Sequence, residues 1–330
     1  MSKGIIERCL EIKHQKCLKV ERKQAIYRTV KFNKKELCTC SLDIGLICDH
    51  GCLYCSTPTI AAARTNRVFK EHGTTAQKTH NAQIACIDLG TPKRVAADAK
   101  KLTESDVVMM CTKVDPYSPA VQDTNLFCDC LHEVLTNNSS CQIRVLSKNA
   151  GIVDVLKDFT EYKDRILFSL SITAPASMQD FIDIVEPNTS TIQERHEAMT
   201  EAHALGFRMY GMVCPCMPGI MTSLEQIKST FQKILDLNPE EIFVEPVNSR
   251  GQGFNNMIAA LDSAGMHSHA KDIKEIKNKD SHDDYVADLI NTVAIAGDLL
   301  NIAAPIRFLS YNKKENIGAK LIDDYHVIWL

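Results

Sequence analysis

The sequence predicts an α/β protein, built as a partial barrel of six strand–helix units with a mostly helical C-terminal segment. An apolar strand followed by a helical stretch recurs at intervals of about 30 to 40 residues. Several of these strands are nearly continuous apolar runs, as expected of parallel strands buried on both faces. Polar residues follow the strands at their carboxyl ends, where parallel α/β folds place their sites. The candidate strands are residues 41–46, 107–111, 142–147, 166–172, 208–214 and 241–246.

Helical segments separate these strands. They cover residues 121–135, 191–205 and 223–235, and serines or threonines at positions 189–191 and 222–223 can cap the last two. The chain after residue 250 reads as mostly helical, and its apolar helix over residues 285–300 is expected to pack against the barrel. We therefore expect a basic arm or helix over residues 1–37, a barrel over 38–250 and a helical cap over 251–330.

Composition narrows the class of protein. The chain has 330 residues, 45% hydrophobic and 24% charged, which is enough to bury a large core and excludes disorder and small disulfide scaffolds. No apolar run reaches the roughly 18 uninterrupted residues of a membrane span. The best candidate, residues 289–306, carries Asn291, Asp298 and Asn301 and reads as a buried helix. The first residues are charged and lack an apolar signal-peptide core, so a cytoplasmic protein is expected.

Positive charge is concentrated at the N-terminus. Residues 1–37 hold 11 Lys and Arg against 4 Asp and Glu, although the whole chain has a net charge of −3. A basic arm of this kind can bind nucleic acid or another polyanion. The alternative is a solvated amphipathic helix whose Ile5, Cys9 and Ile12 face inward. Both interpretations remain open at this point.

The strongest chemical signal is the segment ICDHGCLYCSTP, in which Cys48, Cys52 and Cys55 form a C-x3-C-x2-C pattern directly after the first candidate strand. Fourteen cysteines are many for a reducing compartment, where clustered cysteines indicate metal or redox chemistry more often than disulfides. A four-iron cluster normally takes four cysteines, so three protein thiolates leave one iron with an open position for a ligand. A structural zinc site completed by Cys38, Cys40 or His50 is the alternative.

This pattern, with the aromatic Tyr54 before the third cysteine, resembles the signature of radical S-adenosylmethionine (SAM) enzymes. The resemblance implies a partial or full (β/α) barrel with a 4Fe-4S cluster whose open iron binds SAM. Electron transfer from the cluster then cleaves SAM to methionine and a 5′-deoxyadenosyl radical, which abstracts hydrogen from a substrate. Such an enzyme needs an electron donor of the flavodoxin or ferredoxin type.

Residues 42–250 more closely resemble the spore photoproduct lyase and lyase-like family. The similar segments are VVMMCTKVDPYSP, VLSKN, FSLSI with VEPNTSTIQERHEAM, MVCPCMPGI and FVEPVNSRG, in the family's order. The resemblance assigns Lys148 and Ser171 to the SAM carboxylate and ribose, and the backbone of Tyr54 to the adenine. Cys111 matches the thiol that returns a hydrogen atom to the product radical, and it is expected to face the barrel interior; a core cysteine ending a strand is the alternative.

Other positions depart from the family pattern. Ser56 stands where the lyase has an aromatic, Lys113 replaces a small polar residue, and Cys214 and Cys216 read as structural. Glu245 is expected either to bind SAM or to pair with Arg250. These departures weaken the assignment to repair of a nucleobase lesion in DNA. The alternatives are a radical SAM enzyme that modifies a peptide, tRNA or nucleotide, and a non-catalytic iron–sulfur or zinc protein that binds nucleic acid.

Overall fold

The computed structural model describes residues 9–12, 15–249, 251–322 and 326–330. Its main feature is a sheet with strand order β14-β13-β12-β11-β9-β8-β7-β4-β3, to which β10 adds by pairing with β9. Every pair in this sheet is parallel except β3–β4. The strands are β3 (Ile26–Arg28), β4 (Cys40–Leu42), β7 (Val107–Met110), β8 (Gln142–Ser147), β9 (Ile166–Ile172), β10 (Arg208–Met209), β11 (Gly211–Cys216), β12 (Ile242–Pro246), β13 (Ile306–Ser310) and β14 (Val327–Trp329). The predicted α/β class with a largely parallel sheet is confirmed.

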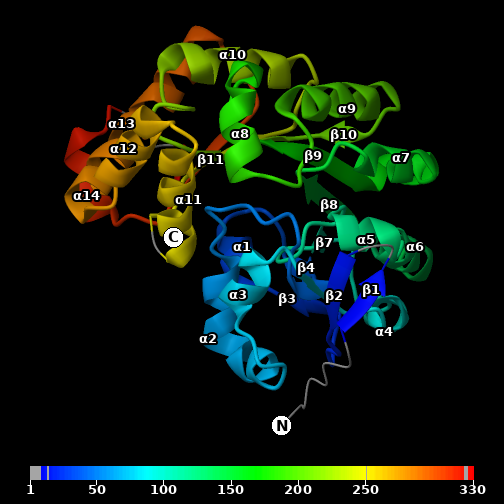
Figure 1. The fold of residues 1–330 in the computed structure, drawn as a ribbon. Helices are drawn as coiled ribbons and strands as arrows, with labels where there is room; N and C mark the ends of the chain where they lie inside the picture. Colours follow the sequence, from blue (N-terminus) through cyan, green and yellow to red (C-terminus); the bar gives the residue numbers. More distant parts are fainter. Residues whose placement is uncertain (1–8, 13–14, 250, 323–325) are drawn as a thin grey trace.

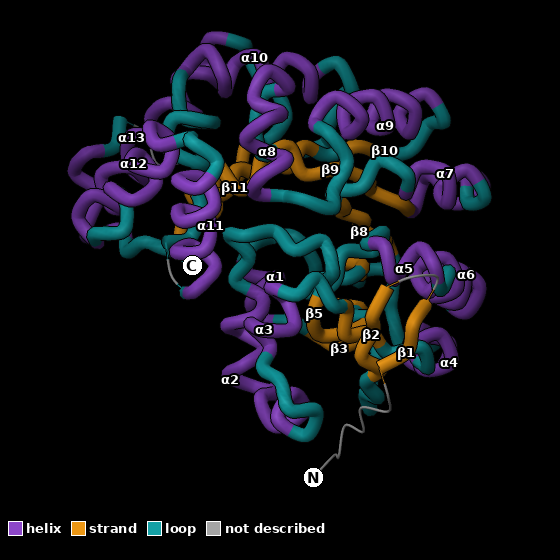
Figure 2. The backbone as a smooth tube through the Cα atoms, viewed as in Figure 1, coloured by secondary structure: helices purple, strands orange, loops and turns teal. Residues whose placement is uncertain are grey.

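Helices surround this sheet (Figure 1), and in Figure 2 α8, α9 and α10 lie along one side of β9 and β11. The helices are α1 (Val30–Lys34), α2 (Thr57–Lys70), α3 (Ala76–Asn81), α4 (Thr91–Ala99), α5 (Pro119–Asp123), α6 (Leu126–Asn137), α7 (Ile152–Lys157), α8 (Gln179–Val185), α9 (Ile192–Ala204), α10 (Leu224–Leu235), α11 (Gln252–Ser263), α12 (His267–Glu275), α13 (Lys279–Leu299) and α14 (Lys314–Ile317), with 3-10 turns at Thr160–Arg165, Ala176–Met178 and Gly318–Lys320. None of the described helices is long and apolar enough to cross a membrane.

Local sequence explains where several helices begin and end. Thr191 and Ser223 each form a capping box, with Glu194 and Gln226 as the reciprocal partners, as the serine and threonine pattern predicts. The single helix predicted over residues 121–135 is wrong. Asn125 has φ 52°, in the left-handed region, and this break separates α5 from α6.

The N-terminal part of the chain forms a second, smaller sheet in the order β1-β2-β6-β5. Its strands are β1 (Cys9–Ile12), β2 (Gln15–Lys19), β6 (Ala85–Ile87) and β5 (Gly45–Ile47). The helical interpretation of the basic arm is therefore wrong for the described residues 9–12 and 15–19, and Ile5 lies outside them. The strand predicted over residues 41–46 is also divided, because the chain leaves the large sheet after Leu42 and joins the small one at Gly45.

Two further strands come from the C-terminal segment. β13 and β14 pair in parallel beyond β12, so residues 251–330 extend the sheet as well as supplying α11–α14. The apolar helix predicted over residues 285–300 is confirmed as the C-terminal part of α13, which ends at Leu299.

The alternation of side chains along the strands separates two cores. The main core fills the space between the sheet and the outer helices, and Phe168 and Leu170 of β9 belong to it. Leu167 of the same strand belongs to a separate apolar cluster on the other face. That interior cluster is formed by Leu37, Cys38, Met109, Leu167, Tyr210, Met212, Phe243 and Leu309. The chain following α1 therefore packs on the face of the sheet opposite the main core.

Candidate functional site

The three cysteines lie on the loop between β5 and α2. Cys52 is buried, whereas Cys48 and Cys55 are half-buried, and all three are free thiols. Burial raises the pKa of each of these thiols. Buried thiols with raised pKa values stay protonated at neutral pH unless a metal displaces the proton. The loop therefore gathers three free thiols on one short segment.

Contacts with surrounding elements fix the backbone of this loop. Its carbonyl and amide groups bind side chains or backbone atoms from α3 and from the end of α8 and the chain just after it. These hydrogen bonds are Leu53 N to Val185 O at 2.9 Å, His80 Nε2 to Cys52 O at 3.0 Å, and Asn188 Nδ2 to Asp49 O at 3.1 Å. Gly51 has φ +71°, a conformation that suits glycine and turns the chain between the first two cysteines. The loop is thus ordered by the protein itself.

A buried carboxylate, Glu186, stands beside the cysteine loop. The guanidinium of Arg195 and the hydroxyl of Tyr54 both donate hydrogen bonds to it, and the hydroxyl of Thr173 donates at 2.8 Å. The ammonium of Lys148 lies 3.3 Å from the same carboxylate and 5.7 Å from the centre of the Tyr54 ring. Burial acts to raise the pKa of Glu186, but Arg195 and Lys148 outweigh it and hold the pKa well below its usual range. Glu186 is therefore a permanent anion in the site.

Arg195 extends this network to β9. Its side chain is fully buried and also donates to the carbonyls of Ser171 and Ser190 and to the hydroxyl of Thr189, at 2.9, 3.0 and 2.7 Å. The carbonyl of Ser171 is held in this way, at the carboxyl end of β9. The network consequently joins the cysteine loop, through Tyr54, to the strand ends that carry Lys148 and Ser171.

Lys148 and Asp115 meet at the neighbouring strand end. Asp115 accepts hydrogen bonds from the Lys148 backbone N–H at 2.8 Å and the Ser147 hydroxyl at 2.6 Å. The ring of His50, inside the cysteine loop, lies 3.5 Å from the same carboxylate. The Lys148 ammonium also donates to the carbonyl of Cys214 at 3.2 Å. Lys148 is therefore held from both its backbone and its side chain.

Glu245 has partners other than those expected from the sequence. It pairs with Lys35 at 3.3 Å, accepts the Tyr311 hydroxyl at 2.6 Å, and lies 3.5 Å from the Sγ of Cys214. The expected alternative partner, Arg250, lies outside the described residues. Cys214 packs against the interior cluster and its thiol lies near both Lys148 and Lys35, so it is placed with the site and not only with the core.

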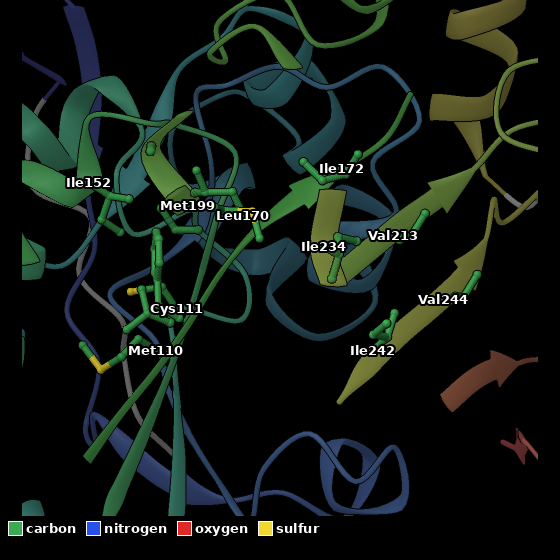
Figure 3. Packing of buried hydrophobic residues seen from close by; sticks show 14 of the residues in the cluster. Met110, Cys111, Ile152, Leu170, Ile172, Met199, Val213, Ile234, Ile242 and Val244 are labelled. Atoms are coloured by element: carbon green, nitrogen blue, oxygen red, sulfur yellow. The ribbon is translucent and has the colours of Figure 1, made fainter. Parts of the chain in front are cut away.

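Cys111 does not face the barrel interior as expected. It follows the last residue of β7 and has φ +65°, which breaks the alternation that would place it on the side of Met109. Its side chain is 7% exposed and belongs to the main core, and Figure 3 draws it in the same cluster as Met110 and Ile152. Burial raises the pKa of its thiol, and Cys48 lies near enough to contribute to that shift.

Comparison with known proteins supports the fold. No protein-family model matches the chain, and no curated protein matches its sequence. Three solved structures that match are of spore photoproduct lyase: a tyrosine-to-phenylalanine variant, and a cysteine-to-alanine variant both alone and with dinucleoside spore photoproduct. Each has a TM-score of 0.51 and 12% sequence identity, over 74% of this chain. The fold resembles the radical SAM partial barrel of spore photoproduct lyase. The matched region spans 65% of those enzymes' length.

Sequence reasoning missed the residues that organise the site. Glu186 and Arg195 both lie in the segment VEPNTSTIQERHEAM, but their pairing across nine positions is invisible without the turn into α9. Among the described residues, no three His, Cys, Asp or Glu side chains are arranged to hold a single metal ion. A four-iron cluster has a different requirement, because each cysteine binds a different iron and the thiols stay further apart.

Proposed function

We propose that this protein is a radical SAM enzyme whose Cys48, Cys52 and Cys55 hold a 4Fe-4S cluster. The observation that carries the proposal is the ordered loop of three thiols at the carboxyl edge of a parallel sheet, beside the ammonium of Lys148. Three thiols suit a cluster with one open iron. When bound and reduced, the cluster would supply the electron for cleavage of SAM to methionine and a 5′-deoxyadenosyl radical, which would abstract hydrogen from a substrate.

The side chains around the loop have separate tasks in this proposal. Lys148 supplies a positive charge for the SAM carboxylate, and Glu186 with Thr173 orients that ammonium without neutralising the whole site, since Arg195 is also present. Ser171 offers a hydroxyl for the ribose. Tyr54 serves the adenine through its backbone, while its hydroxyl is occupied by Glu186.

Two thiols are candidates for the hydrogen donor that quenches a product radical. Cys111 carries the role through resemblance to the lyase family. Cys214 carries it through position, because its thiol lies beside Glu245 and near Lys148 on the interior side. Burial raises the pKa of both thiols, so both keep their hydrogen at neutral pH.

Repair of a nucleobase lesion in DNA is the substrate proposal that the similarity to spore photoproduct lyase favours. Lys31 and Lys34 of α1 are exposed and offer contacts for phosphate groups. The enzyme also requires an electron donor, for which a flavodoxin or ferredoxin type is proposed. A peptide, tRNA or nucleotide substrate is the alternative.

The metal content of anaerobically purified protein tests this proposal. We expect brown protein with about four iron atoms per chain, and loss of iron in Cys48→Ala. Cys128→Ala is the matched control, because this half-buried thiol lies on α6 outside the cysteine loop. Colourless protein loaded with zinc would contradict the cluster and favour the non-catalytic metal protein.

A further inference from the structure

Gly253 lies in the first turn of α11 and is in direct contact with the cysteine loop. A Cβ atom at this position would lie 2.6 Å from the carbonyl oxygen of Leu53 and 3.0 Å from that of Cys55. The contact with Leu53 is shorter than real Cβ atoms make, the contact with Cys55 is tight, and both partners are backbone atoms that cannot rotate away. Glycine disfavours a helix by about 1 kcal/mol relative to alanine. The close approach is therefore the physical reason for a glycine here.

The rest of α11 is fixed, so the helix cannot retreat from the loop. Phe254, Met257 and Leu261 are buried in the main core. The side-chain amide of Asn256 donates to the side-chain oxygen of Asn81 on α3 at 3.2 Å. Figure 1 shows α11 beside the segment that carries α1 to α3. A side chain added at Gly253 would consequently displace the cysteine loop.

The loop is held from its other side as well. Leu53 donates its N–H to the carbonyl of Val185 at the end of α8, and the ring of His80 on α3 contacts the carbonyl of Cys52. The segment from Cys52 to Cys55 is therefore contacted by three helices, α3, α8 and α11.

We infer that Gly253 is a positioning residue for Cys55, and that α11 forms one wall of the cluster site. This inference rests on the proposed function only where it concerns the cluster. The C-terminal segment expected as a helical cap is then part of the site, because its first helix sets the position of the segment that carries the third thiol.

Thiol labelling of the iron-free protein tests the positioning directly. In Gly253→Ala, iodoacetamide should alkylate Cys55 about fivefold faster or more, as expected when overpacking opens the loop. The alkylation rate of Cys128 on α6 should not change, and peptide mass spectrometry separates the two sites. Gly318→Ala is the matched control, because a Cβ there meets only a side-chain carbon at 3.5 Å.

The reconstituted protein gives a second measurement. In Gly253→Ala the cluster should be lost several-fold faster in air, and the change that SAM causes in the electron paramagnetic resonance spectrum of the reduced cluster should be altered. Equal Cys55 labelling and equal cluster lifetime in the variant and the parent would overturn the inference. Should Gly253→Ala not fold, Met257→Ala decides, because it removes a buried anchor of α11. Cys55 should then also be alkylated faster, and parental Cys55 labelling in that variant would overturn the inference. A parent protein that binds no iron, with faster Cys55 labelling in the variant, would refute the proposed function and support the positioning of Cys55 by α11.

Discussion

Replacing Glu186 by glutamine removes the charge at the centre of the buried network while keeping its shape. The variant leaves Arg195 buried without its anion, and removing one partner of a buried ion pair costs about 3 to 5 kcal/mol. Arg195 retains three other acceptors, the carbonyls of Ser171 and Ser190 and the hydroxyl of Thr189, so the lower figure applies. For a chain of 330 residues, about 3 kcal/mol lowers the melting temperature by about 4 °C.

Urea denaturation and thermal unfolding measure this loss. Glu240→Gln is the matched control, because Glu240 pairs with Arg208 at the surface and its side chain is 44% exposed. Exposed pairs contribute roughly 0 to 1 kcal/mol, so that variant should remain close to the parent. If Glu186→Gln unfolds at the same urea concentration as Glu240→Gln, the buried network does not stabilise the fold as described.

The pH dependence of the free energy of unfolding tests whether the charge of Glu186 stabilises the fold. Burial acts to raise the pKa of Glu186, but Arg195 and Lys148 outweigh it, so the folded pKa lies below that of the unfolded chain. The stability contributed by Glu186 is then fully present at neutral pH and is lost as the pH falls. The gap between the parent and Glu186→Gln should therefore narrow below roughly pH 4. A gap that widens on acidification would contradict this assignment of charge.

Three other substitutions test separate parts of the account. Lys148→Gln should weaken SAM binding about tenfold or more, measured by equilibrium dialysis, with the iron content of the protein unchanged. Cys111→Ser and Cys214→Ser should both leave SAM cleavage intact, and the one that diverts a known substrate to trapped products, seen by chromatography, identifies the hydrogen donor; parental products from both would exclude a thiol donor. Replacing Lys31 and Lys34 by alanine should flatten the salt dependence of nucleic-acid affinity by up to about 2 in logarithmic slope, and an unchanged slope would exclude phosphate contacts at α1.

The sequence predicts the fold class well because its signals are local. Nearly continuous apolar runs at β7, β9 and β12 mark parallel strands, and the capping residues Thr191 and Ser223 mark helix starts. β13 and β14 escape prediction because they lie far from the repeating strand–helix units and interrupt a mostly helical segment. The passage of the chain from β4 in the large sheet to β5 in the small sheet could not be predicted, because the apolar pattern is the same in either sheet.

In the candidate site, too, residues with local sequence signals could be predicted and the others could not. Cys48, Cys52 and Cys55 are found from their spacing, and Lys148 from its place at a strand end. The direction of Cys111 depends on a positive φ at a non-glycine residue, which apolar periodicity does not reveal. The partners of Glu186 come from the cysteine loop, from the residue after β8 and from α9, so only the folded chain brings them together.

The contacts of Glu245 and Gly253 could not be predicted either, because their partners lie far away in the sequence. Lys35, the partner of Glu245, lies 210 positions away in the basic N-terminal segment. Gly253 contacts a loop about 200 positions earlier, and a glycine inside an amphipathic helix signals only that something lies close to it. Neither contact follows from spacing, because each depends on how the chain returns to the carboxyl edge of the sheet.

Three thiols on the loop before α2 are proposed to hold a cluster at which SAM is cleaved. Anaerobically reconstituted protein, reduced with dithionite and incubated with SAM, should release 5′-deoxyadenosine, detected by chromatography, even without substrate. Cys55→Ala should abolish this release, and Cys128→Ala should not change it. Release of 5′-deoxyadenosine by Cys55→Ala at the parental rate, or none from the iron-loaded parent, would contradict the claim.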